Sequence, residues 1–195
     1  MKTFTKSDIR GDGDEILTPS GLVKFTYEIE QDEDIGPPWK ESDFHGPVSQ
    51  WTTRDKHAGE WILHKDRHSR LRLYYDAAEA QRMALRDGWG LSEEDTAALA
   101  KKLDHAPSRG EVAVEAVRHD FKRLQDWCED RWCWLWYRVT VTGPDGQEYE
   151  DTLGGIDDED YARECIAEFI NSTLTEIQGE AEERAHWEAR DSVTI

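Results

Sequence analysis

Cysteine, methionine and proline are scarce in this 195-residue chain, which contains three, two and six of them. The cysteines Cys128, Cys133 and Cys165 are too few for a disulfide framework, and a sparse, odd set indicates reduced thiols. No apolar run approaches the ~18 residues of a membrane span. The polar residues 1–15 also lack the apolar segment of a secretory signal. The sequence therefore predicts a cytoplasmic protein with no membrane partner.

The chain also lacks the short motifs that mark common catalytic sites, since GxGxxG, GxxxxGK[ST], HExxH and GxSxG do not occur. His64 and His68 fall on a predicted turn, where the geometry of a metal-binding pair is not fixed. Cys128 and Cys133 have zinc-like spacing, but no second closely spaced pair accompanies them. We predict no catalytic residue, no cofactor and no metal site, and a protein that is not an enzyme. A metal-dependent enzyme using His45, His64 or His68 remains an alternative.

Aromatic residues are abundant, with nine Trp, six Tyr and five Phe. Each can bury ~150–250 Å² of surface, so a sizeable core is possible although the apolar fraction is only 37%. Trp132, Trp134 and Trp136 have equal parity and would share one face of a strand. We interpret that face as core; an exposed face would instead anchor a partner or stack bases.

Acidic charge is concentrated at the two ends of the chain. The net charge is -19, and residues 145–195 hold 16 acids against 3 bases, whereas residues 51–144 are balanced at 16 against 16. Solubility alone does not require such an arrangement, because a net charge of magnitude ~2–8 suffices for a small domain. A concentrated charge creates a directional field that attracts basic surfaces and repels nucleic acid.

Hydrophobic periodicity, turn residues and caps predict an α+β fold. Short antiparallel strands and hairpins would pack with three to four helices, the last of them long and acidic. We expect strands at 25–29, 60–65, 71–75, 132–142 and 147–153, and helices beginning at Asp76, Ser92, Ser108 and Asp157. Residues 39–59 would form an ordered loop anchored by Trp39, Phe44 and Trp51. The predicted organisation is a flexible leader at 1–20, an α+β lobe at 21–106, and a helix-hairpin-helix lobe at 107–195. Each lobe offers a strand pair followed by an acid-capped helix.

The final helix has two predicted faces. Its apolar stripe would comprise Tyr161, Cys165, Phe169, Ile170, Leu174 and Ile177. Its acidic residues form the candidate partner-binding surface: Asp157, Asp160, Glu164, Glu168, Glu176, Glu180 and Glu183. Like charges four residues apart destabilise a helix by ~0.2–0.5 kcal/mol per pair. This row is either an ordinary solvated face or a set of carboxylates that imitates the phosphates of a nucleic acid.

Four short segments are distinctive: residues 38–49 (PWKESDFHGPVS), 51–56 (WTTRDK), 73–76 (LYYD) and 84–90 (ALRDGWG). Together they resemble a family of uncharacterised acidic proteins carried by bacteriophages and related mobile elements. The resemblance covers about residues 38–90 and transfers no activity and no catalytic residue. Small acidic phage proteins include anti-restriction and anti-CRISPR inhibitors that mimic DNA, so the resemblance implies a role against host defence.

These observations combine into one functional prediction. We expect a phage-encoded inhibitor of a host defence system, acting in the host cytoplasm as a nucleic-acid mimic. It would bind the basic nucleic-acid-binding groove of a host defence nuclease or effector complex, without binding nucleic acid directly. An adaptor that binds through the aromatic loop 38–51, with Trp39, His45 and Trp51 as contacts, is the alternative.

Overall fold

The computed structural model describes residues 2–41 and 43–192. The chain forms two compact units. The terminal unit combines both ends of the chain, Met1–Ile35 and Cys133–Ile195, and the central unit is Gly36–Trp132. This division differs from the predicted lobes at 21–106 and 107–195, because a strand near the N-terminus pairs with a strand of the late hairpin.

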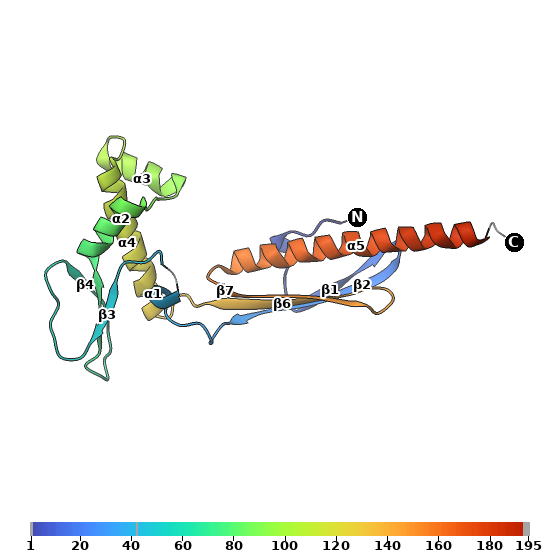
Figure 1. The fold of residues 1–195 in the computed structure, drawn as a ribbon, viewed down its shortest axis with the longest axis horizontal. Helices are drawn as coiled ribbons and strands as arrows, with labels where there is room; N and C mark the ends of the chain where they lie inside the picture. Colours follow the sequence, from blue (N-terminus) through green and yellow to red (C-terminus); the bar gives the residue numbers. More distant parts are fainter. Residues whose placement is uncertain (1, 42, 193–195) are drawn as a thin grey trace. The chain divides into compact units, whose positions relative to one another are not determined.

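The terminal unit is a four-stranded antiparallel sheet in the order β1-β2-β6-β7, with one long helix along one face (Figure 1). Its elements are the 3-10 helix η1 (Lys6–Asp8), β1 (Gly13–Thr18), β2 (Gly21–Gln31), β6 (Leu135–Thr142), β7 (Glu148–Ile156) and α5 (Glu159–Ser192). The strand alternation at 25–29 and the late hairpin are confirmed. The final helix is also confirmed, although it begins two residues after Asp157, and the Asp158 side chain accepts a hydrogen bond from the Asp160 N–H.

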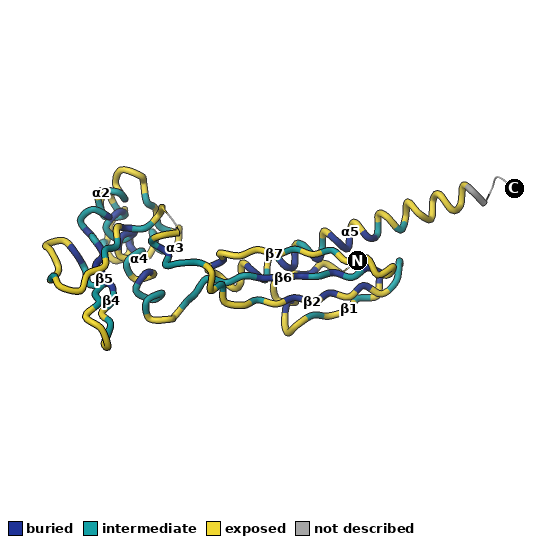
Figure 2. Tube along the Cα trace, turned by 60° about the horizontal axis from the view of Figure 1, so that its bottom comes forward, coloured by how far each residue is buried: buried dark blue, intermediate teal, exposed yellow. Residues whose placement is uncertain are grey.

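The core of the terminal unit lies between the sheet and α5. Alternate residues of β2 and β6, among them Phe25 and Val139, face Ile166, Ile170 and Leu174 of the helix. Figure 2 shows the buried positions in this layer and a last stretch of α5 that is exposed on all sides. The buried apolar residues of the helix therefore end at Ile177.

Two predictions for this unit are wrong. Over its described residues the predicted leader at 1–20 is instead part of the fold, since it contains η1 and β1, Phe4 and Ile9 are buried, and Asn171 exchanges two 2.8 Å hydrogen bonds with the Phe4 backbone. In the apolar stripe, Tyr161 is 53% exposed, and small side chains such as Ala162 contact the sheet instead. The core face of α5 runs through Ala162, Ile166, Ile170, Leu174 and Ile177, so Tyr161, one position before Ala162, lies to the side of that stripe.

The described residues of the central unit form a three-stranded antiparallel sheet in the order β3-β5-β4, together with four helices (Figure 1). Its elements are α1 (Pro38–Glu41), β3 (Val48–Trp51), β4 (Glu60–Lys65), β5 (Arg72–Asp76), α2 (Ala77–Asp87), α3 (Glu93–Leu103) and α4 (Arg109–Cys128). The predicted helix starts are confirmed because local capping sets them: Asp76, Ser92 and Ser108 each accept a backbone N–H at the first turn. The two units together confirm the α+β class.

The predicted loop at 39–59 contains both a short helix and the edge strand β3. Trp39 is an anchor, since its ring meets that of Trp127 edge-on at 5.3 Å. Phe44 is not an anchor, since it is 80% exposed, and Trp51 is 45% exposed. No helix in the described part of the chain has an apolar stretch long enough to cross a membrane.

Candidate functional site

The two units differ sharply in charge although they are almost equal in length. The terminal unit contains 25 acidic and 8 basic residues, a net charge of -17. The central unit contains 18 acidic and 16 basic residues, a net charge of -2. The acidity of the two chain ends is thus gathered on one unit, because strand pairing brings the ends together.

The acidic candidates on α5 and its N-terminal approach all face solvent. The seven exposed residues are Asp157, Asp160, Glu164, Glu168, Glu176, Glu180 and Glu183. Asp160 forms an exposed ion pair with Lys6 at 2.9 Å, and this lysine lowers the pKa of the Asp160 carboxyl. Glu180 accepts a hydrogen bond from the Tyr149 hydroxyl at 3.4 Å. Glu164, Glu168 and Glu176 form no ion pair with any residue that the structure describes.

The sheet face opposite α5 is also acidic. Glu28 of β2 and Glu150 of β7 lie on either side of Arg138, at 3.6 and 3.1 Å from its guanidinium. The same guanidinium lies 5.6 Å from the centroid of the Trp136 ring. Further carboxylates on this face are Glu15, Glu30 and Glu148. Arg138 and Lys24 are the cations among these acids on this face, so both sides of the terminal unit present carboxylates.

The three tryptophans predicted to share a strand face do not do so. Strand β6 begins at Leu135, so Trp132 and Trp134 precede it, and Trp132 belongs to the central unit. Trp136 is half-buried on the open side of the sheet, away from the core layer that contains Tyr137 and Val139. The prediction that these alternate residues share one face is wrong because the strand begins later than the hydrophobic pattern indicates.

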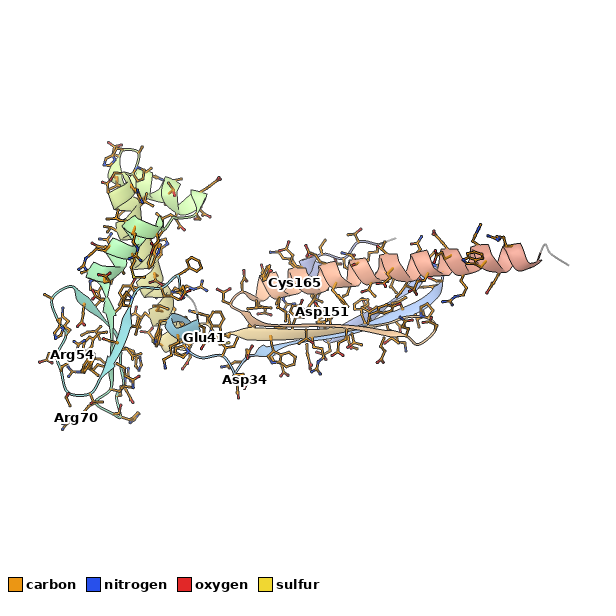
Figure 3. The ribbon with its side chains drawn as sticks, viewed as in Figure 1. Asp34, Glu41, Arg54, Arg70, Asp151 and Cys165 are labelled. Atoms are coloured by element: carbon orange, nitrogen blue, oxygen red, sulfur yellow. The ribbon has the colours of Figure 1, made fainter. Side chains whose placement is uncertain are left out.

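Arg54 lies in the loop between β3 and β4 (Figure 3), and its side chain clamps the secondary candidate Trp51. The Arg54 guanidinium lies 4.7 Å from the Trp51 ring centroid and 4.6 Å from that of Tyr74. It also donates two hydrogen bonds, of 2.7 and 2.8 Å, to the Glu60 carboxylate. Glu60 is buried, and the hydrogen bonds from Arg54 lower its pKa to about 2. The clamp fixes the loop and orients Trp51.

His45 belongs to a buried polar cluster that the sequence did not indicate. Its Nδ1 lies 2.5 Å from Oδ1 of Asp120 on α4. The other oxygen of Asp120 accepts the Gly46 N–H at 2.8 Å and the Tyr75 hydroxyl at 2.7 Å. Burial and the Asp120 charge raise the pKa of the Tyr75 hydroxyl above its usual value. A Cβ at position 46 would clash with the Tyr75 ring, so the close approach requires glycine.

A groove of about 810 Å³ adjoins this cluster within the central unit. It is lined by Phe44, His45, Asp87, Gly88, Trp89, Gly90, Ala116, His119, Asp120, Lys122, Arg123, Asp126 and Trp132. Histidine and aspartate are common enough that nothing in the sequence marked Asp120. Only the packing of α4 against the loop after α1 brings it to His45.

The other candidate metal ligands do not form a site. His64 is on β4 and His68 is in the turn that follows. Burial raises the pKa of the Cys128 thiol to about 11, which disfavours the thiolate that a metal site or a nucleophile needs. No group of three or more His, Cys, Asp or Glu side chains in the described residues is arranged to hold a metal ion.

Comparisons with known proteins do not assign the chain to a family. No protein-family model matches it, and neither curated proteins nor solved structures give a significant match.

Proposed function

We propose that the terminal unit binds the basic nucleic-acid-binding groove of a partner protein by presenting carboxylates in place of phosphates. The observation that carries this proposal is the row of exposed acids on α5, in a unit with a net charge of -17. A helix positions these groups rigidly, at about 1.5 Å of axial rise per residue. Binding would release anions and water from the basic groove, by analogy with counterion release from DNA.

The physical arrangement supports a role in binding more than one in stability. Like charges at a spacing of four residues, such as Glu164 and Glu168, weaken a helix by ~0.2–0.5 kcal/mol per pair. The core contacts of α5 lie on its other side, so these acids add nothing to packing. We extend the proposal, on the sequence resemblance alone, to a bacteriophage inhibitor whose target is a host defence nuclease or effector complex.

The proposal is tested by capture followed by competition. The full chain is immobilised, exposed to lysate, and washed with short duplex DNA or with an equal concentration of a neutral polymer. We expect the bound protein to leave with duplex DNA and to stay bound in the neutral wash. It should also leave as salt rises, because exposed charge acts over only ~8 Å at physiological ionic strength. A partner that resists both DNA and salt would contradict nucleic-acid mimicry.

The exposure of Phe44 and Trp51 favours a second candidate, an adaptor that binds through residues 38–51. Trp39 would contribute little to that surface, because its ring packs on Trp127. Binding through aromatic side chains would be nearly independent of salt, and Trp51→Ala would abolish it. The same salt series therefore separates the two candidates.

A further inference from the structure

Residues 51–72 of the central unit are basic, although the chain as a whole has a net charge of -19. They contain six Lys and Arg, three Asp and Glu and three His, which gives a net charge of +3 with His neutral. The segment runs from the end of β3 through a loop, β4 and a turn to the first residue of β5. Arg54 marks the loop and Arg70 marks the turn (Figure 3). Four of the cations are exposed, and we call them the basic tip: Lys56, Lys65, Arg67 and Arg70.

The cations of the basic tip are available to a ligand. None of the four forms an ion pair or a side-chain hydrogen bond with any residue that the structure describes. Two of the three acids in the segment are already paired, since Glu60 accepts two hydrogen bonds from Arg54. Asp55 pairs with the guanidinium of Arg72 at 2.9 Å. The third acid, Asp66, accepts two hydrogen bonds from within its own turn. With the two ion pairs set aside, four cations remain against one carboxylate, so the basic tip attracts anions.

The sheet places an aromatic ring beside these cations. Arg72 of β5 is paired directly with Trp51 of β3 and with Lys65 of β4. Residues directly opposite each other in antiparallel strands project from the same face of the sheet. The neighbouring residue Leu73 and its alternate Tyr75 belong to the core that packs against α2 and α4. Because side chains alternate along a strand, the row from Trp51 to Lys65 lies on the opposite, open face.

Trp51 is held ready for stacking. The Arg54 guanidinium covers one face of the indole, 4.7 Å from its centroid, and 45% of the residue remains exposed. The loop that carries Arg54 is tied to the sheet, because the Tyr74 hydroxyl donates to the Arg54 carbonyl at 2.9 Å. A ring that is already fixed loses less conformational freedom when a ligand binds.

We propose that Trp51 and the basic tip bind single-stranded nucleic acid, with a base stacked on the indole and backbone phosphates at the four cations. Every base has a face that can stack on an aromatic ring, and an unpaired base leaves that face accessible. Lysine and arginine supply the charge that holds phosphate. This surface lies on the central unit, so it does not depend on the partner proposed for the acidic helix. It departs from the expectation of no direct nucleic-acid binding, which came from the acidic ends of the chain.

The experiment measures the fluorescence anisotropy of labelled oligothymidylate and oligouridylate of about ten nucleotides during titration with the full chain. Titrations at ~0.15 M salt limit the reach of the acidic terminal unit, because exposed charge then acts over only ~8 Å. We expect saturable binding that weakens with salt, with a log–log slope of about -3 for four phosphate contacts. An abasic strand of the same length should bind at least about tenfold more weakly, because it offers no base to the indole.

Trp51→Ala separates stacking from charge. It should weaken binding of the base-bearing strands about tenfold and leave the affinity for the abasic strand unchanged. A variant that had merely lost its fold would bind both kinds of strand more weakly. Equal affinity of the wild type for abasic and base-bearing strands would overturn the stacking role.

The charge of the basic tip is tested by Lys65→Gln, Arg67→Gln and Arg70→Gln together. This variant should bind at least about tenfold more weakly, with the magnitude of the salt slope reduced by about 2.

The matched control carries Arg82→Gln, Lys101→Gln and Arg118→Gln, at exposed positions of α2, α3 and α4. It removes the same charge and should bind as the wild type does. Equal loss in both triple variants would indicate a general charge effect and overturn the proposal. So would the absence of saturable binding up to about 0.1 mM chain, or equally effective displacement of the strand by polyglutamate.

Discussion

The terminal and central units share a local arrangement of strands and helix but differ in their surface charge. In each, an antiparallel strand pair leads directly into a helix that packs beside it: β6, β7 and α5 in one, β4, β5 and α2 in the other. The terminal unit places unbalanced carboxylates on its surface, whereas the central unit nearly balances its charges and buries some of them. Patterning and capping thus lead to a similar local scaffold in both units, while the surface charge on that scaffold differs between them.

The largest change in the free energy of unfolding is predicted for core substitutions, which test whether each unit is stabilised by its own core. Ile170 in the terminal unit and Leu124 in the central unit are both fully buried. Replacing either with alanine should lower the free energy of unfolding by about 2–5 kcal/mol, from lost burial and the cavity left behind. Hydrogen exchange should show the loss of amide protection confined to the unit that carries the substitution. Equal loss in both units after Ile170→Ala alone would show one cooperative core.

A smaller effect concerns the response of the central unit to acid. The folded-state pKa of Glu60 is about 2, below the ordinary value of 4.5, because Arg54 stabilises the carboxylate. A lowered folded pKa adds stability above pH 4.5, and this contribution is lost as the pH falls towards 2. The free energy of unfolding of the central unit, measured with urea, should therefore fall between pH 4.5 and 2. In the Glu60→Gln variant this free energy should vary less with pH. Arg82→Gln, which removes an exposed pair with Glu79, is the matched control and should leave the dependence unchanged.

Much of the fold follows from local signals in the sequence. The helix starts at Asp76, Ser92 and Ser108 are right because a cap needs only the residues of its own first turn. The α5 acids are exposed as expected, because their spacing alone separates them from the apolar stripe. Tyr161 is misplaced because the buried stripe begins one position later, at Ala162, and a small residue gives a weak hydrophobic signal.

The rest depends on contacts between residues far apart in the sequence. His45 and Asp120 are separated by 75 positions, and no local pattern connects them. The pairing of β2 with β6 likewise joins two distant segments, and it is this pairing that gathers the acidic ends into one unit. The predicted lobes at 21–106 and 107–195 failed for the same reason, since they assumed that neighbours in sequence fold together.

The most direct test of the account compares two charge reversals of equal size in the full chain. One variant carries Glu164→Lys, Glu168→Lys and Glu176→Lys on α5, and the control carries Glu41→Lys, Glu93→Lys and Glu94→Lys on exposed positions of the central unit. Affinity for the captured partner is measured across a salt series, with thermal unfolding as the check on folding.

We predict that the α5 variant binds at least about 100-fold more weakly, with stability unchanged or slightly raised because repulsion along the helix is relieved. The control variant should bind as the wild type does, with the same salt dependence. Equal weakening of both variants would show that only the net charge matters. Undiminished binding of the α5 variant would contradict the proposal that its carboxylates form the interface.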